Sequence, residues 1–423
     1  MSGNPYLNGS DYLMLGFDHE LRRRGFAGNS CQIVLELGAT ISPAALQQRL
    51  AALRNRYPIL RARRGGVLRP HWKLPRRPEP NLSIRVHDDE PEVSQRLFNE
   101  PLATERGELV RFDLVRRAGG RMDLLFTWAH ALMDAPAAEH FLAVVGREDL
   151  PWPTAPSPAP RKTKLRLTER CKLAWKNLYQ IDQFCQAAPR SLGARHGSAP
   201  AWLHYRVIKF SAAETERVRA NARQHCGVLG AAQFHAAAAL LELHQLHQRL
   251  GCPSPSYILP VPIGLRPKGT IEPLFSNQLT MLMTQFLPEH LDSLASAVAS
   301  LRAQTVEALR VGLCESSRLL TDLFRFLPLP IYMAILKRGL RGEICSLFYG
   351  NTAEVSPLLT SFMGAPIEDF IHVAAVTPSP GLGVIFYFFR GEMRVTVLRL
   401  ATVLTDAETA GFAAGLRARL LNP

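Results

Sequence analysis

A proline-rich stretch followed by a basic segment interrupts the chain between two longer portions. Five prolines lie within Pro151–Pro160, and Arg161–Arg190 is basic and rich in helix-forming residues. This composition is typical of a linker that carries a helix. The sequence therefore predicts an N-terminal lobe over residues 1–155, a linker with a basic helix over 156–198 and a C-terminal lobe over 199–423. A chain of 423 residues is long enough for two lobes.

Strand and helix patterns alternate irregularly in both portions. Ser30–Leu37 alternates as a strand does, residues 42–55 form a predicted helix, and Val110–Arg116 with Met122–Trp128 form a predicted hairpin. Such irregular alternation predicts an α/β fold of mixed sheets with helices rather than a doubly wound parallel sheet. Beyond the linker we expect strands at Leu203–Phe210, Tyr257–Leu265, Gln278–Phe286, Leu382–Arg390 and Glu392–Leu398, and helices from Ser211 and over Val228–Arg249, Leu291–Leu309 and Asp406–Leu421.

An excess of positive charge narrows the classes of partner. Fifty Lys and Arg against 36 Asp and Glu give a net charge of +14. This excess favours CoA phosphates, an acidic carrier protein, a membrane surface or nucleic acid, and charge alone leaves the four open. Hydrophobic residues at 47% and charged residues at 20% exclude disordered, collagen-like and disulfide-scaffold classes.

Cysteine usage and the apolar runs indicate the compartment. Seven cysteines without a CxxC pair imply neither a disulfide framework nor a zinc ribbon. Residues 1–16 lack the basic and apolar regions of a signal peptide. The longest apolar window, Phe326–Leu336, contains two prolines and is well short of the roughly 20 residues that span a bilayer. We therefore expect a cytoplasmic chain without a transmembrane helix, and contact with the inner membrane surface stays open as an alternative.

His130 and Asp134 are the residues that most directly suggest chemistry. They are four positions apart and follow a predicted strand, with a helix predicted over 137–145, so they lie on a connection that presents side chains to a cleft. An imidazole kept neutral there can take a proton from an attacking hydroxyl, thiol or amine. The short loop aims Asp134 away from the cleft, where it can pair with an arginine. The alternative is a half-buried histidine that only satisfies its own hydrogen bonds at a strand end.

The run from His130 to Asp134 resembles the HxxxD signature of an acyltransferase superfamily. This superfamily includes chloramphenicol acetyltransferase, the condensation domains of peptide synthetases, the BAHD enzymes and bacterial wax ester synthase type acyltransferases. Similar segments occur in the same order along essentially the whole chain. They are Asp11–Leu15 (the opening segment), Leu46–Arg63 (a helix with "HPxLR", Tyr57 replacing the usual His), Val261–Arg266 ("VPVxxR"), Phe275–Asn277 and Thr360–Pro366 ("SNxxGP").

The resemblance implies two chloramphenicol acetyltransferase-like lobes with the active site at their interface. It implies an acyltransferase that moves an acyl group from a CoA or acyl carrier protein thioester to a hydroxyl or amine, with His130 as general base. By the same resemblance Asp134 is structural and pairs with Arg61, or in second place with Arg266. Asn277 or Ser361 would donate a hydrogen bond to the oxyanion. We expect no metal and no bound cofactor, since the thioester is a donor substrate in lipid or natural-product biosynthesis.

Departures from the family pattern keep a second function open. Ala129 stands where many members have a first His, Ala135 where many have Gly, and Phe362 where Asn is common. A catalytically inactive, condensation-domain-like binding or scaffolding protein is therefore the alternative. Retention of both His130 and Asp134 favours the enzyme.

Other candidate features have ordinary explanations. Glu242, His244 and His247 lie at helical spacing without HExxH or a third ligand cluster, which indicates a solvated helix face rather than a metal site. Arg22–Arg24 and Arg161–Lys176 lack the stacking aromatics of a nucleic-acid-binding module, so we expect no nucleic acid. The apolar and basic segment Arg318–Arg341 suits either a membrane-surface contact or a packed helix pair.

Overall fold

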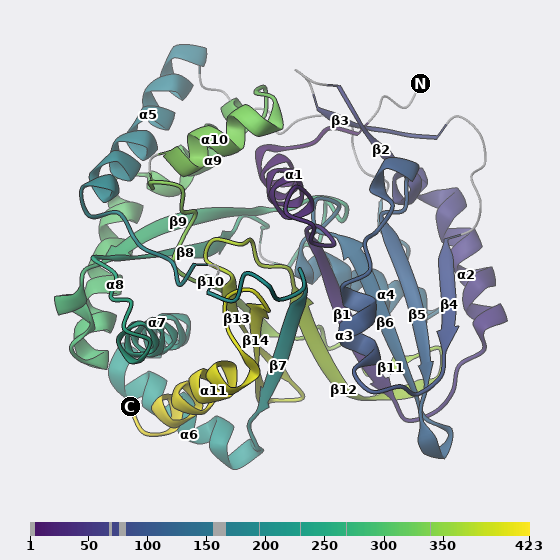
Figure 1. The fold of residues 1–423 in the computed structure, drawn as a ribbon. Helices are drawn as coiled ribbons and strands as arrows, with labels where there is room; N and C mark the ends of the chain where they lie inside the picture. Colours follow the sequence, from purple (N-terminus) through teal and green to yellow (C-terminus); the bar gives the residue numbers. More distant parts are fainter. Residues whose placement is uncertain are drawn as a thin grey trace.

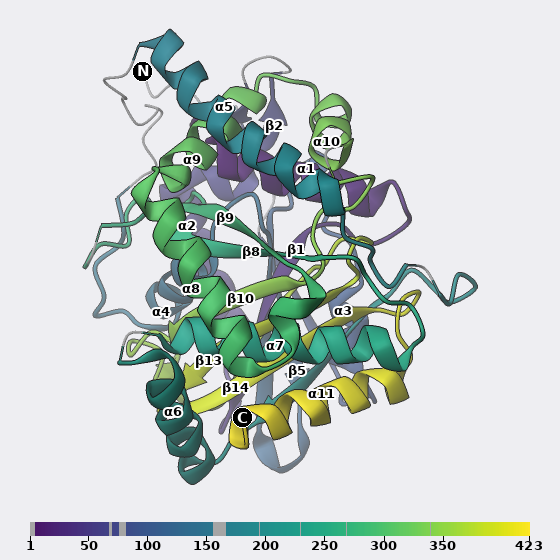
Figure 2. The same ribbon diagram turned by 90° about the vertical axis from the view of Figure 1, so that its left-hand side faces the viewer.

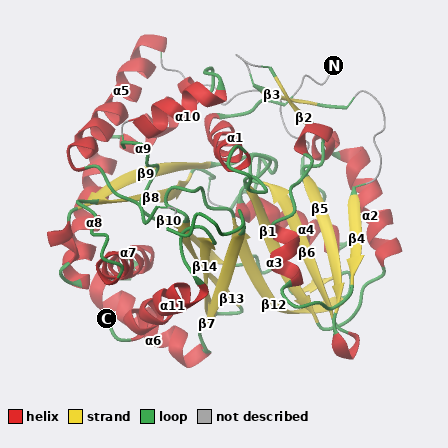
Figure 3. Cartoon of the chain, viewed as in Figure 1, coloured by secondary structure: helices red, strands yellow, loops and turns green. Residues whose placement is uncertain are grey.

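Two mixed β-sheets, each covered by helices, form the framework of the molecule (Figure 1). In the cartoon the helices lie mainly on the outside and the strands between them (Figure 3). The predicted α/β class of mixed sheets and helices is confirmed. The computed structural model describes residues 5–66, 70–75, 82–154, 166–193, 195–228, 230–267, 269–338 and 340–423.

The larger sheet contains strands from both ends of the chain. Only its β4–β5 pair is parallel among the pairs described. The strand β12 comes from the C-terminal portion but lies beside β1, so the sequence boundary at residue 198 does not separate the two sheets. In spatial order the strands are β11 (Ser361–Phe362), β12 (Ala365–Ala374), β1 (Ser30–Leu37), β6 (Met122–Ala129), β5 (Val110–Arg116) and β4 (Ser83–His87).

Successive side chains of β1 pack on opposite faces of this sheet. Ile33 and Leu35 are fully buried and belong to the main core, together with Phe126 of the neighbouring strand. Val34 points to the other face and packs in a separate small cluster with Leu97 of α3 (Val93–Phe98). Successive side chains on a strand point to opposite faces, so β1 fills two cores at once. The helices α2 (Pro43–Arg56) and α4 (Ala135–Gly146) contribute to the main core.

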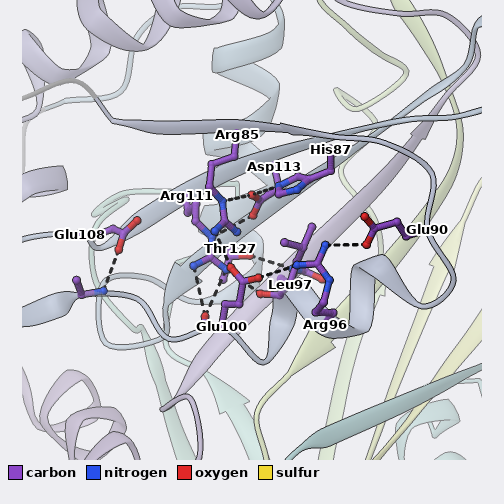
Figure 4. Close-up of polar contacts among 12 residues, drawn as sticks. Arg85, His87, Glu90, Arg96, Leu97, Glu100, Glu108, Arg111, Asp113 and Thr127 are labelled. Carbon is purple, nitrogen blue, oxygen red and sulfur yellow. Dashed lines mark hydrogen bonds and ion pairs between the residues drawn. The ribbon is translucent and has the colours of Figure 1, made fainter.

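A network of charges ties α3 to the outer face of the larger sheet (Figure 4). The fully buried carboxylate of Asp113 accepts hydrogen bonds from Arg85 at 2.6 Å and from Arg111 at 3.0 Å. Arg111 also donates to the Leu97 carbonyl at 2.7 Å. Burial by itself would raise the pKa of Asp113, but hydrogen bonds and charges from these arginines hold it below its usual value. Arg85 also donates to Glu100 at 2.5 Å, so the charges of the network are paired with one another, which indicates a structural role.

The smaller sheet supports the C-terminal portion. The helix α7 is largely buried and packs against α6, α8 and α11 beside this sheet. The strands are β10 (Phe348–Glu354), β13 (Leu382–Phe389), β14 (Glu392–Leu400) and β7 (Leu203–Lys209), and the helices are α6 (Ala212–Cys226), α7 (Ala231–Arg249), α8 (Leu294–Arg310) and α11 (Asp406–Leu421).

A third group of elements bridges the two sheets at one end of the molecule (Figure 2). An added Cβ at Gly9, the first residue of α1, would lie 2.5 Å from the Asp322 amide nitrogen, so only glycine permits this close approach to α9. The helix α9 also packs against α5. The elements are α1 (Gly9–Arg22), α5 (Leu167–Phe184), α9 (Leu313–Phe324), α10 (Leu329–Arg338), the hairpin of β8 (Tyr257–Gly264) and β9 (Leu279–Phe286), and the short hairpin of β2 (Arg63–Gly65) and β3 (His71–Lys73).

Part of the predicted linker, residues 156–165, lies outside the described residues. Within the described ranges, the basic helix of the linker is α5. No single helix among the described residues is long and apolar enough to cross a membrane, and one pair, α6 with α7, meets the length and composition requirement only across a 95° bend.

Candidate active site

His130 lies at the turn between β6 and α4. The strand ends at Ala129, and the His130 amide donates a hydrogen bond to the Asn29 carbonyl at 3.0 Å. Asp134 then caps α4, because its side chain accepts a hydrogen bond from the Ala137 amide at 3.2 Å. These contacts keep the imidazole at the strand end, ahead of the helix.

Both carboxylate oxygens of Asp134 are occupied. Arg266 Nη2 donates to Oδ1 at 2.8 Å and to Oδ2 at 3.0 Å, and the Gln278 amide donates to Oδ2 at 2.9 Å. The side chains of the ion pair are only 11% and 7% exposed. Asp134 belongs to the N-terminal portion and Arg266 follows β8, so this pair joins the two portions beside His130.

Arg266, and not Arg61, is the ion-pair partner of Asp134, so the first-choice assignment of this role to Arg61 is wrong. Arg266 directly follows β8, and its hairpin partner β9 begins just after Gln278, which also contacts Asp134. Arg61 instead ends the short 3₁₀ helix Pro58–Arg61, before the β2–β3 hairpin. The pairing of β8 with β9 therefore determines that Arg266 is the arginine that contacts the Asp134 carboxylate.

The side-chain amide of Asn277 supports the turn that carries His130. Its Nδ2 donates to the His130 carbonyl at 2.8 Å and to Asp11 Oδ1 at 3.0 Å. Both amide hydrogens are therefore used, and the remaining Oδ1 can only accept. The prediction that Asn277 donates to an oxyanion is wrong for this reason, and the residue positions the His130 main chain instead.

Asp11 of α1 is the buried carboxylate that orients Asn277. Its Oδ1 also accepts from the Asn277 main-chain amide at 2.7 Å, and its Oδ2 accepts from the Asn8 amide at 3.1 Å. Burial raises the pKa of Asp11 to about 7, although hydrogen bonds from Asn277 act to lower it. In the sequence Asp11 stands out only as part of an opening segment, because its contact with Asn277 joins residues far apart in the chain.

Ser361 lies far from His130. It begins β11, which pairs with the start of β12, and this part of β12 lies beside Leu37 at the end of β1. Leu37 pairs with Met122, at the opposite end of β6 from Ala129. Seven residues at about 3.3 Å each separate these ends of β6 by roughly 20 Å. The prediction that Ser361 stabilises an oxyanion is therefore wrong.

Burial favours the neutral form of the His130 imidazole. Removal from water lowers the pKa of His130, although the nearby charge of Asp134 acts to raise it. A histidine whose pKa lies below its ordinary value near 6.5 is unprotonated at pH 7 and can accept a proton.

A second buried histidine, His372 of β12, lies near His130. It stacks on Trp128 at a ring-centroid distance of 6.1 Å and is 3% exposed. Burial lowers the pKa of His372 to about 4, and the charge of His130 acts in the same direction. No sequence pattern indicates this neighbour, because only the pairing of β1 with β12 brings residue 372 close to the HxxxD turn.

A cavity of about 670 Å³ lies directly beside the turn that carries His130. Ala129 and Ala131, on either side of the histidine, both line it. The charged side chains that line the cavity are predominantly basic, which suits an anionic ligand. They are Arg22, Arg23, Arg63, Arg64 and Lys73, against Asp18 and Glu105.

Among the described residues, no group of three or more His, Cys, Asp or Glu side chains is arranged to hold a metal ion. The predicted solvated helix face is wrong for Glu242 and His247, each only 1% exposed, and His244 and His247 contact polar groups of the protein. The Nδ1 atom of His244 lies 3.0 Å from the Tyr257 hydroxyl, and that of His247 lies 2.8 Å from the Cys252 carbonyl oxygen.

Comparison with known proteins identifies the fold. No family model matches the sequence, and no curated protein matches it. The first condensation domain of the CDA synthetase is similar in structure, with a TM-score of 0.70 and 16% identity over 100% of this chain and 97% of that one. The TRI3 trichothecene 15-O-acetyltransferase from Fusarium sporotrichioides has a TM-score of 0.73 and 14% identity over 98% of this chain and 94% of that one.

The starter condensation domain of rhizomide synthetase RzmA, as a double mutant in complex with C8-CoA and Leu-SNAC, is similar as well. Its TM-score is 0.62 at 15% identity, over 99% of this chain and 94% of that one. All three matches extend over nearly the whole of both chains, so the likeness includes both sheets and the bridging elements. The chain therefore has the two-lobed, chloramphenicol acetyltransferase-like fold that these condensation domains and this acetyltransferase share.

Proposed function

We propose that this protein is an acyltransferase that moves an acyl group from a thioester donor to a hydroxyl or amine acceptor. The observation that carries the proposal is the placement of His130 beside a basic cavity, on a turn held by Asn277 and by the Asp134–Arg266 ion pair. The fold is that of condensation domains and an acetyltransferase, which supports the same class of reaction.

In the proposed reaction the imidazole of His130 accepts the proton of the acceptor hydroxyl or amine. The acceptor oxygen or nitrogen attacks the thioester carbonyl, and a tetrahedral oxyanion forms. The carbon–sulfur bond then breaks, and the thiolate takes the proton back from the imidazolium. Asp134 takes no part in proton transfer, because Arg266, Gln278 and the start of α4 already occupy its oxygens.

The basic cavity is proposed to receive the donor. Both CoA and the phosphopantetheine arm of a carrier protein carry a phosphate at the end of the pantetheine chain opposite the thiol, and phosphate favours arginine and lysine partners. Five basic side chains against two acidic ones line this cavity beside the candidate base. Both donors present a phosphate group, and steady-state kinetics with each donor distinguish CoA from a carrier protein.

Reversal of charge at the cavity should weaken donor binding selectively. The variant Arg64→Glu/Lys73→Glu, at two residues that line the cavity, is expected to raise KM for an acyl-CoA by roughly tenfold at low ionic strength. KM for an acyl-N-acetylcysteamine thioester, which has no phosphate, should stay unchanged. Steady-state kinetics with the two donors, and with an acyl carrier protein as a third, measure the difference.

The matched control for this test is Arg223→Glu/Arg302→Glu, which makes the same change in net charge. Both residues are exposed, one on α6 and the other on α8. Equal effects of the two double variants on acyl-CoA binding would mean that only net charge matters, and would remove the assignment of this cavity to the donor.

The pH dependence of transfer should report the lowered pKa of His130. The neutral imidazole is the active form, so kcat/KM should fall on acidification through a pKa below about 6.5 and stay level between pH 7 and 8. A profile that keeps rising through pH 8 would instead point to another base, or to titration of the acceptor itself.

A product screen tests the proposed function as a whole. The protein is incubated with a panel of acyl thioesters and of hydroxyl and amine acceptors, and new esters or amides are detected by mass spectrometry. Products that depend on His130 support the enzyme. Donor binding without any product across the panel would favour the alternative, a binding or scaffolding protein of this fold.

A further inference from the structure

The helix α5 carries large apolar side chains on its solvent side. Leu167, Trp175 and Tyr179 are 64%, 69% and 61% exposed. Trp175 and Tyr179, four residues apart, lie along one side of the helix, and Leu167 is exposed in its first turn. The side of α5 opposite Trp175 and Tyr179 is buried against α9 through Ala174 and Asn177, so these exposed apolar side chains have no covering element in the described structure.

The helix α10 repeats the pattern at the same end of the molecule. Ile331 and Ile335, four residues apart, are 51% and 40% exposed. Both views of the ribbon place α5 and α10 together at this end (Figures 1 and 2). Of the eleven large hydrophobic side chains that are exposed in the described structure, six lie on α5 or between Phe326 and Ile335. We call Leu167, Trp175, Tyr179, Ile331 and Ile335 the α5–α10 face.

An apolar cavity of about 220 Å³ lies directly beneath the α5–α10 face. Both helices contribute to its lining, and Ile335 is at once exposed and part of the cavity wall. The cavity therefore reaches the surface at the face itself. Most of its walls are apolar, which suits an alkyl chain. Representative side chains of the lining are Phe17, Leu178, Ile181, Leu320 and Phe324.

Basic side chains surround the α5–α10 face. Lys172 and Lys176 lie beside its aromatic residues on α5, and Arg338 and Arg341 follow its isoleucines, all four of them exposed. The acidic residues of α5 are Glu169 and Asp182. Aromatic and aliphatic side chains interleaved with lysine and arginine are typical of helices that lie in the interface of an anionic bilayer.

We propose that the α5–α10 face docks on an anionic lipid surface, so that an alkyl chain leaving the bilayer enters the apolar cavity beneath it. The docking requires only the face and its charges. The entry of the chain as part of an acyl donor or acceptor rests on the proposed function. The apolar cavity and the basic cavity then lie on different sides of α1, and both are lined by residues of that helix.

Vesicle co-sedimentation tests the docking without any need for activity. The full chain should bind vesicles that contain phosphatidylglycerol and bind phosphatidylcholine vesicles at least tenfold more weakly. The variants Leu167→Ser and Trp175→Ser should each lower the apparent affinity by several-fold to tenfold, because each removes a large apolar side chain from the interface. The variant Lys172→Glu/Lys176→Glu should lower it further and reduce the dependence on salt.

The matched control is Leu309→Ser, since Leu309 is 61% exposed but belongs to α8 and to neither helix of the face. It should bind vesicles as the unmodified chain does. Transfer from a short acyl thioester in the absence of lipid should be unchanged in every variant, which separates a failure of docking from a failure of the proposed function. Unaltered vesicle binding in the face variants would overturn the proposal. So would a concentration-dependent dimer that the same variants abolish, because the face would then bind a second copy.

Discussion

Replacement of His130 by alanine is expected to lower the turnover of acyl transfer by roughly 10² to 10⁴, the range typical of a lost general base. No other side chain of the turn that carries His130 can replace the imidazole as a base, because Ala131, Leu132 and Met133 carry no basic group and the oxygens of Asp134 are already occupied. KM for the donor should change little, because the imidazole acts on the acceptor proton. Initial rates at saturating donor, with the product measured by mass spectrometry, give the ratio.

A histidine that lines the basic cavity itself provides the control. His19 of α1 lines the basic cavity but lies outside the HxxxD turn. The variant His19→Ala should therefore retain turnover within a few-fold of the unmodified chain. Full activity of a folded His130→Ala variant would show that the histidine is not the base, and equal losses in the two variants would point to a general disturbance of the cavity.

Removal of Asp134 should lower the free energy of unfolding by about 3 to 5 kcal/mol, the cost of leaving one partner of a buried ion pair alone. Arg266 would remain only 11% exposed with no carboxylate beside it, and α4 would lose its N-terminal cap. Activity should fall as well, because the turn that carries His130 loses its attachment to the β8–β9 hairpin. Urea titration of Asp134→Ala, followed by circular dichroism, measures the loss.

A double-mutant cycle assigns this loss to the ion pair. Asp134→Ala and Arg266→Ala should be strongly non-additive, since either change alone breaks the same contact. Arg61→Ala should add independently to Asp134→Ala. Additivity with Arg266 together with coupling to Arg61 would contradict the partner seen in the structure, and lost activity at unchanged stability would make Asp134 a participant in the chemistry.

Much of the fold could be predicted because its elements carry local signals. The alternation in Ser30–Leu37 and the caps at Ser42 and Ser211 correspond closely to β1, α2 and α6. The helix α1 and the strand β12 were not predicted. The buried polar residues of α1, among them Ser10 and Asp11, obscure its apolar face, and their burial depends on partners hundreds of residues away.

The residues of the candidate site also fall into two groups, those with a local sequence signal and those without one. His130 and Asp134 are four residues apart, and a local motif brings them to notice. The partner of Asp134 and the partners of Asn277 lie 132 to 266 residues away in sequence, so composition and spacing carry no information on them. The family resemblance placed Arg266 second as the partner of Asp134 and gave Asn277 the wrong role. A motif identifies the type of a residue. It does not show whether the side-chain hydrogens of that residue are already used by its neighbours.

The position of β12 has a consequence for the order in which the protein can assemble during synthesis. The strand β1 ends at Leu37, but the neighbour on its outer edge begins at Ala365, so the ribosome must add more than 300 residues before that edge is covered. At about 5 to 20 residues per second this takes roughly 20 to 60 s. Throughout that interval β1 presents unpaired amides and carbonyls on a strand rich in Ile, Val and Leu, the kind of edge that recruits other chains. The nascent chain is therefore expected to depend on chaperones until β12 emerges, and expression of residues 1–198 alone should give aggregates.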